Sequence, residues 1–338
     1  MGGNALKQYE TRRIGREEYE KLENTVRSNI DQLFGPDSFN HINFYRMKND
    51  FGDMDFVLVT DVVTWKDDII QHWGLDPSRY FSNGNVLSFG IDNFQVDAIH
   101  QDEHIAKFAI NYYSYNDLGN LLGRYAHKLG MKLGHDGLWL VVRSPETDTR
   151  ILDNILLTRD WNTVLDILYL DKDVYSNGFD TLDDIFEYVM SSKWFDPDIF
   201  LLDNRNHTSR VRDKKRITYN KFLDYIVDKK GSYQFKTPSS RGGHAVREPY
   251  YTEIILDWFP WVKNVVNELL DNDQLNQKFK EIYNGKVVEK ITGLSGKKLG
   301  IFMGQLQWDN ILKKRAIQDP DLVKQVIKAK MDQLNLKS

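Results

Sequence analysis

Two aspartates separated by one residue, Asp53 and Asp55, open an apolar stretch that reads Gly-Asp-Met-Asp-Phe-Val-Leu-Val over residues 52–59. Side chains alternate across a β-strand, so a strand here places both carboxylates on one face and the apolar side chains on the other. Two neighbouring carboxylates repel each other, and a bound divalent cation relieves that repulsion. Mg²⁺ is usually held by one or two carboxylates together with substrate phosphates. The pair therefore indicates a magnesium-dependent phosphoryl-transfer site, although a solvent-exposed strand end would also explain it.

A third carboxylate, Asp97, lies in the middle of another predicted strand, residues 94–100, with apolar neighbours. Alone, it could be an edge residue or a hydrogen-bonded one. With Asp53 and Asp55 it could hold two Mg²⁺ ions, for which Mn²⁺ can substitute, and align an in-line displacement at phosphorus. We expect Asp53 and Asp55 to touch both ions. Asp97 would touch the ion that activates the attacking hydroxyl and would accept its proton.

The surrounding elements must bring these strands together. Apolar residues at helical spacing predict a helix over residues 17–34, which Gly35-Pro36 ends. Strands are predicted at 41–47, 53–59, 86–89 and 94–100, with a short helix at 67–73. We expect the strand of Asp97 to lie antiparallel to the strand of Asp53 and Asp55.

An aromatic turn and a helix follow at residues 112–130. Asn116 is the predicted N-cap of this helix. Asp117, Asn120 and Arg124 recur at helical spacing and therefore share one polar face. An ordinary amphipathic helix would show the same pattern.

Together these motifs resemble the palm and nucleotide-selecting subdomain of the X family of DNA polymerases, over roughly residues 40–145. Gly52-Asp53-Met54-Asp55 reproduces the family's metal-binding motif, and Gln95-Val96-Asp97-Ala98 fits its third aspartate. The segment 112–117 matches the turn that holds the incoming sugar and base. Asn120 and Arg124 stand where the family probes the minor groove and the template. The resemblance implies an α+β fold, a polymerase-β-like nucleotidyltransferase palm with a mixed or antiparallel sheet, followed by a mostly helical C-terminal domain.

One family feature is absent from its usual place. The glycine pair whose N–H groups cradle the triphosphate is missing between residues 41 and 52, and we predict that Gly2-Gly3-Asn4 folds back to supply it. A disordered N-terminus is the alternative, and Arg46 and Lys48 are then the next candidates. Tyr115 replaces the glycine of the sugar-contacting turn, which puts sugar discrimination in doubt. The predicted nucleotide-binding residues are Gly2, Gly3, Asn4, Gly52, Tyr113, Asn116, Asp117, Asn120 and Arg124.

We predict two domains: residues 1–145, the palm and nucleotide-selecting subdomain, and residues 146–338, a mostly helical nucleic-acid-binding domain. The second contains a cluster of basic residues and a basic loop that would neutralise nucleic-acid phosphates. A solvated helix start would also explain the cluster. The residues are Arg205, Arg210, Arg212, Lys214, Lys215, Arg216 and, in the loop, Arg241.

Composition narrows the class of protein. The 338 residues include no cysteine, which excludes disulfides and thiol nucleophiles and suggests a reducing, cytoplasmic setting. The sequence contains no apolar run of about 18 residues, so it predicts no membrane-spanning helix. With a net charge of −4, affinity for nucleic acid must come from local patches.

The predicted function is transfer of nucleotides from a nucleoside triphosphate to a nucleic-acid 3′-hydroxyl, as in a DNA polymerase of the X type acting on a DNA or RNA primer and template. An RNA-terminal or tRNA (CCA-type) nucleotidyltransferase is the alternative. A lesser one is an inactive scaffold that binds nucleotides or nucleic acid. The sequence leaves the oligomeric state open.

Overall fold

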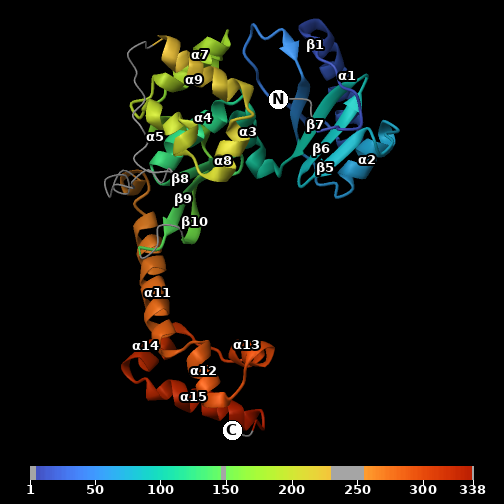
Figure 1. Cartoon of the computed structure of the whole chain (residues 1–338). Coiled ribbons are helices and arrows are strands. Elements are labelled where there is room, and N and C mark those ends of the chain that lie inside the picture. Colours follow the sequence, from blue (N-terminus) through green and yellow to red (C-terminus); the bar gives the residue numbers. More distant parts are fainter. Residues whose placement is uncertain (1–4, 146–149, 230–254, 337–338) are drawn as a thin grey trace. The chain divides into compact units, whose positions relative to one another are not determined.

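The computed structural model describes residues 5–145, 150–229 and 255–336 (Figure 1). The chain forms two compact units, Met1–Leu140 with Leu156–Trp258, and Val141–Ile155 with Phe259–Ser338. The sequence prediction placed one boundary after residue 145. The compact units keep residues 156–258 with the N-terminal part and group residues 141–155 with the C-terminal helices, and the two predicted functional domains stay a prediction.

The first unit contains a five-stranded sheet with the order β2-β4-β7-β6-β5. Its strands are β2 (Phe39–His41), β4 (Asp53–Leu58), β5 (Tyr80–Asn83), β6 (Val86–Ile91) and β7 (Phe94–His100). The central pair, β4 and β7, is parallel, and the other pairs are antiparallel. The predicted mixed sheet is thus confirmed, whereas the predicted antiparallel arrangement of the Asp97 strand and the Asp53/Asp55 strand is wrong. Helix α2 (Trp65–His72) and the β5–β6 hairpin intervene between β4 and β7, so the chain enters both strands from the same end.

Helices cover both faces of this sheet. Helix α1 (Arg16–Phe34) begins one residue before the predicted start and buries Val26 and Ile30 against Met54 and Phe56. On the opposite face, Val57 packs under α3 (Glu103–Tyr113). Alternation along β4 therefore sends its even-numbered side chains into one core, and the odd-numbered face carries Asp53 and Asp55.

Short elements frame the sheet. Strand β1 (Ile14–Gly15) pairs with β3 (Asp50–Phe51) just before β4. The strand predicted at 41–47 is displaced, because regular pairing ends at His41. Residues 46 and 47 instead donate backbone hydrogen bonds to the carbonyls of Phe179 and Asp180.

The remainder of the first unit is largely helical. After α3 come α4 (Leu118–Lys128) and a three-stranded sheet, β8 (Met131–Gly134), β9 (Gly137–Arg143) and β10 (Ile151–Thr158), in the order β10-β9-β8. The end of β9 and the start of β10 belong to the second unit. The helices that follow are α5 (Trp161–Ile167), α6 (Lys172–Asn177), α7 (Leu182–Met190), the 3₁₀ turns η1 (Pro197–Phe200) and η2 (Leu202–Asn204), α8 (His207–Asp213) and α9 (Ile217–Lys229). Buried aromatic side chains from α4, α7, η1 and α9, including Tyr125, Phe186, Phe200 and Phe222, hold them together.

The second unit is built from α11 (Val262–Ile282), α12 (Gly285–Thr292), α13 (Gly296–Gly304), α14 (Asn310–Gln318) and α15 (Asp321–Gln333). Its small core is centred on Phe279, Val288, Phe302 and Ile327. Buried Asp273 of α11 accepts hydrogen bonds from Ser144 and Arg150, which attaches residues 141–155 to this unit. Among the helices that the structure describes, none is long and apolar enough to cross a membrane.

Candidate active site

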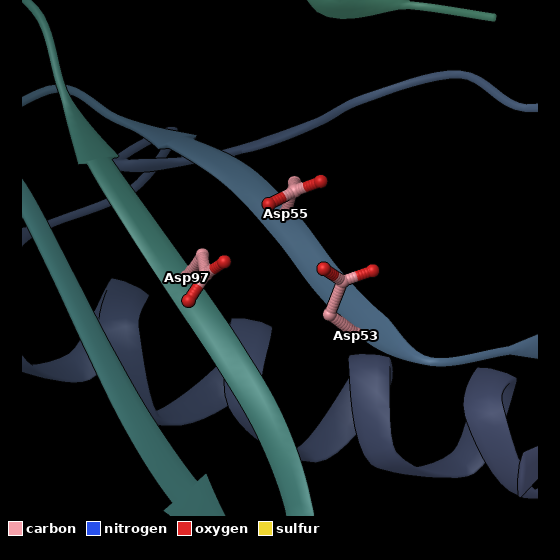
Figure 2. A group of neighbouring side chains, drawn as sticks. All are labelled: Asp53, Asp55 and Asp97. Carbon is pink, nitrogen blue, oxygen red and sulfur yellow. The ribbon is translucent and has the colours of Figure 1, made fainter. Parts of the chain in front are cut away.

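The three predicted aspartates meet on the sheet face that carries the odd-numbered residues of β4. Asp55 and Asp97 stand directly opposite each other on the parallel strands β4 and β7, and Asp53 precedes Asp55 by one pleat. Each offers a carboxylate oxygen, and these oxygens all lie within 4.8 Å of one another. Figure 2 shows the side chains directed into the same space from two neighbouring strands. Among the residues that the structure describes, these three acidic side chains are the ones that lie close enough together to share a metal ion as a group.

Cross-strand pairing explains why polar groups gather here. Every second residue of β4, β7 and β6 contributes to a row on this face. The rows are Val57, Ile99 and Val86, then Asp55, Asp97 and Ser88, then Asp53, Gln95 and Gly90. The first row packs against α3 and is apolar. The carboxylates occupy the rows just beyond that helix, where a substrate can reach them.

The three carboxylates lie close together, and the pKa values of Asp55 and Asp97 are perturbed. Burial is the main cause that raises the pKa of Asp55 well above its usual range, with repulsion from Asp53 and Asp97 adding to it. Burial also raises the pKa of Asp97 to about 6, against the opposing effect of hydrogen bonds from Ser88 and Gln95. Asp55 as a whole residue is nevertheless exposed, so solvent can reach the cluster. Burial and mutual repulsion destabilise the ionised carboxylates, and a bound divalent cation would offset that destabilisation.

A lysine lies next to the cluster. The ammonium group of Lys48 is 4.7 Å from the ring centre of Phe51, and burial lowers its pKa while Asp53 and Asp55 oppose that effect. Arg46, the other reserve candidate for phosphate contact, is paired with Asp180 and donates to the carbonyl of Asn177 at 2.7 Å. Of these two cations, Lys48 is therefore the one near the carboxylates.

The predicted cradle Gly2-Gly3-Asn4 lies outside the described residues. The first described residue, Ala5, donates its backbone N–H to Oε1 of Gln95 at 2.9 Å. Gln95 belongs to the same row as Asp53. The described chain thus begins at the edge of the carboxylate cluster.

The turn before α4 differs from the prediction. Tyr113 ends helix α3, and its ring stacks on His135 at 5.9 Å. Burial, and to a smaller extent Asp55, raises the pKa of Tyr113, which places this ring within electrostatic reach of the carboxylates. Asn116 is not the N-cap, because its φ of 62° places it in the left-handed region one residue too early, and Asp117 takes the capping position.

Asp117, Asn120 and Arg124 share one face of α4 as predicted, but other parts of the chain cover that face. Asp117 forms an ion pair with Arg216, and Oδ1 of Asn120 accepts a hydrogen bond from Arg212 at 3.0 Å. Arg124 is 8% exposed and donates twice to the carbonyl of Ile199, at 2.9 and 2.7 Å.

Burial, and then the charge of Arg205, lowers the pKa of Arg124 to about 10. In this structure Arg124 therefore links α4 to η1 and is not free to contact a template.

The basic cluster is not one uniform surface. Arg205 is buried against Asp213, whose side chain has no exposure, so this pair holds α8 to the helical core. Arg212 is exposed and Arg216 half-buried, and both also contact Asp213. The remaining members of the cluster, Arg210, Lys214 and Lys215, are half-buried or exposed. Arg241 lies outside the described residues.

No family model and no curated protein matches the sequence. Among solved structures, the chain is similar to polymerase beta of Leishmania infantum, described as a ternary P/T complex, with a TM-score of 0.36 and 15% identity over 50% of this chain and 77% of that chain.

Two residues of the site escaped the sequence prediction. Ser88 and Gln95 both hydrogen-bond to the carboxylate of Asp97. Gln95 could have been found, because it precedes Asp97 by two residues on a predicted strand and so shares its face. Ser88 could not, since its position depends on the pairing of β6 with β7.

Proposed function

We propose that this protein is a nucleotidyltransferase that moves a nucleotide from a nucleoside triphosphate to the 3′-hydroxyl of a nucleic acid. The observation that carries the proposal is the convergence of Asp53, Asp55 and Asp97, with ligand oxygens within 4.8 Å, on an accessible part of one sheet face. A structural role for this cluster would leave three mutually repelling carboxylates without a compensating benefit.

The donor set fits divalent metal ions such as Mg²⁺ or Mn²⁺, since it consists of hard carboxylate oxygens. Asp53 and Asp55 would hold both ions of a pair, and Asp97 would hold one. Bound ions would make the attacking hydroxyl more acidic and neutralise charge on the phosphate. Asp97 would accept the proton of the hydroxyl, and the hydrogen bonds from Ser88 and Gln95 keep its carboxylate oriented.

The nucleotide would lie between the carboxylates and helix α4. Gly2, Gly3 and Asn4 remain the proposed triphosphate cradle, and the attachment of Ala5 beside the cluster supports this. Lys48 would add a positive charge, and Gly52 and Tyr113 would contact the sugar and base. We also retain four proposed nucleotide contacts on the turn and helix: Asn116, Asp117, Asn120 and Arg124. The last three are already bonded to Arg216, Arg212 and the carbonyl of Ile199, which would have to move or contact the nucleotide as well.

The nucleic acid would bind through its phosphates to Arg210, Arg212, Lys214, Lys215 and Arg216 and to the loop of Arg241. The accessible side chains of Arg212, Lys214 and Lys215 support this role. Arg205 would contribute by holding α8 in place.

A DNA polymerase of the X type is the first candidate, because Asp117, Asn120 and Arg124 occur at the spacing typical of template-dependent enzymes. One observation favours a second candidate, a terminal nucleotidyltransferase acting on RNA. Arg124 is buried and committed to Ile199. A template contact through Arg124 would require breaking two hydrogen bonds to a carbonyl, each worth about 1.5–3 kcal/mol because the donor is charged.

Extension assays separate these possibilities. The purified chain is incubated with Mg²⁺ or Mn²⁺ and labelled nucleoside triphosphates on primed DNA of varied template sequence and on unpaired RNA ending in a 3′-hydroxyl. A template-dependent enzyme adds the complementary nucleotide, whereas a terminal transferase adds the same nucleotide whatever the opposing base. Asp97→Ala should abolish transfer and leave nucleotide binding measurable, and Asp61→Asn, on the exposed loop after β4, is the control. Near-normal turnover of Asp97→Ala would overturn the assignment.

A further inference from the structure

Gln95 occupies the centre of the site, although it is neither acidic nor exposed. It is 2% exposed and lies on β7 between Asp53 of β4 and Gly90 of β6. Its Nε2 donates to both carboxylate oxygens of Asp97, at 3.0 Å each, and its Oε1 accepts from the N–H of Ala5 at 2.9 Å. One side chain thus joins the carboxylate cluster to the start of the described chain.

The two contacts fix the orientation of the amide. An ionised carboxylate only accepts hydrogen bonds, and a backbone N–H only donates. The nitrogen of Gln95 must therefore face Asp97 and the oxygen must face Ala5. Rotating the amide by half a turn would break both contacts at once, so each contact supports the other.

The N-terminal segment, defined here as residues 5–9, has a second attachment one strand away. The ring of Tyr9 lies where Gly90 leaves space, since a Cβ on Gly90 would come within 3.0 Å of three ring atoms. The hydroxyl of Tyr9 accepts the N–H of Asn93 at 2.9 Å. Between these points, Leu6 is 5% exposed. The segment is therefore docked on the same row of the sheet that contains Gln95.

We propose that Gln95 is a positioning residue that couples docking of the N-terminal segment to the orientation of the Asp97 carboxylate. When the segment leaves the sheet, Oε1 loses its partner and the amide no longer holds Asp97 in one orientation. When Asp97 is absent, Nε2 loses both acceptors and the amide no longer presents Oε1 to Ala5. By linkage, docking of the segment and the held orientation of Asp97 favour each other by the same free energy. The catalytic meaning of this coupling rests on the proposed nucleotidyl transfer, whereas the coupling itself is a property of the metal-free chain.

The experiment measures hydrogen exchange of residues 5–13 by mass spectrometry in the metal-free, full-length protein. Gln95→Met keeps the length of the side chain and removes both contacts, so exchange should become roughly fivefold faster, as expected for the loss of about one net hydrogen bond. The decisive variant is Asp97→Ala, which does not touch the segment and should accelerate exchange in the same direction. The matched control is Gln101→Met, because Gln101 is also a buried glutamine, directly after β7, and should leave the segment unchanged.

A second measurement tests the reverse direction. Gly90→Ala displaces Tyr9 without altering Gln95 or the aspartates, so it should undock the segment and weaken binding of Mn²⁺ alone, followed by its paramagnetic signal, by a similar factor. In nucleotide transfer it should affect KM for the metal as well as for the triphosphate. A fold check comes from exchange in β4 and β7, which should stay as slow as in the unaltered protein. Unchanged exchange of residues 5–13 in Asp97→Ala overturns the coupling, whether or not the protein transfers nucleotides. Absence of transfer with faster exchange would instead overturn only the proposed function.

Discussion

Replacing Asp97 with asparagine should make the metal-free protein more stable, even though it destroys the proposed site. Burial raises the pKa of Asp97 from 3.8 to about 6, so the folded chain binds a proton at this carboxyl more tightly than the unfolded chain does. Stability contributed by the protonated form is present below pH 4 and is lost as the pH rises through about 6. Asparagine has the shape of the neutral carboxyl and avoids this loss.

The structure sets the size of the effect. A change in pKa from 3.8 to about 6 corresponds to about 3 kcal/mol of unfolding free energy. Asp97 is partly exposed, and solvent screening reduces the figure to about 1–3 kcal/mol. For a protein of this size, each kcal/mol raises the melting temperature by about 2–4 °C. We therefore expect Asp97→Asn to melt about 2–12 °C higher at pH 7.5 in a chelator.

Thermal unfolding at several pH values provides the test. The difference between the variant and the unaltered protein should be largest at pH 7.5 and disappear near pH 4. Mn²⁺ should raise the melting temperature of the unaltered protein above pH 6, where Asp97 is ionised, and should raise that of the variant less, because one proposed ligand is missing. Asp61→Asn should show neither behaviour. If Asp97→Asn melts at or below the temperature of the unaltered protein at pH 7.5 without metal, the electrostatic reasoning is refuted.

Three further changes test other parts of the site. Gly119→Ala puts a Cβ within 3.0 Å of the carbonyl oxygen of Tyr112 and should lower the unfolding free energy in urea by about 2–3 kcal/mol. In the control Gly123→Ala the nearest atom to the new Cβ is 3.9 Å away, so the unfolding free energy should be unchanged or slightly higher. Equal effects of the two changes would contradict this. Changing Arg210, Arg212 and Lys215 together to alanine should weaken binding to all nucleic-acid sequences alike and reduce the salt slope by about 2–3; an unchanged slope would assign them to a merely solvated surface. Gly3→Val should raise the KM for nucleotide and spare primer binding; if deletion of residues 1–5 leaves nucleotide affinity unchanged, the cradle lies elsewhere and Lys48→Met becomes the next test.

The strand that carries Asp53 and Asp55 was predictable because its signal is local. Alternation along residues 53–58 fixes which side chains share a face, and the structure buries Met54, Phe56 and Leu58 accordingly. The direction of the neighbouring strand was not predictable in the same way. Whether β7 runs parallel to β4 depends on the path of some 35 intervening residues, which no pattern within either strand records.

The same distinction applies to the contacts of helix α4. Periodicity identified the face that Asp117 and Asn120 share, but it could not show that Arg216 and Arg212, some 90 to 100 residues later, meet that face. Composition identified the basic cluster at 205–216, but it could not show that Arg205 is buried against Asp213. Long-range pairing of charges depends on tertiary packing, which local sequence determines only in combination with the rest of the chain.

These long-range contacts also join two surfaces that the sequence analysis predicted as separate sites. The predicted nucleotide face of α4 and the predicted phosphate-binding cluster form one network, in which four arginines face two aspartates. The arginines are Arg124, Arg205, Arg212 and Arg216, and the aspartates are Asp117 and Asp213. An excess of positive charge remains. Burial raises the pKa of Tyr112, and the charges of Arg212 and Arg216 oppose that effect. Burial also raises the pKa of the adjacent Tyr113, and Asp55 adds to it, so these tyrosines lie within electrostatic reach of both the arginines and the carboxylates. A substrate with several negative charges would be attracted to the arginine side and reach the carboxylates only with bound cations, which is the charge arrangement that nucleotidyl transfer requires.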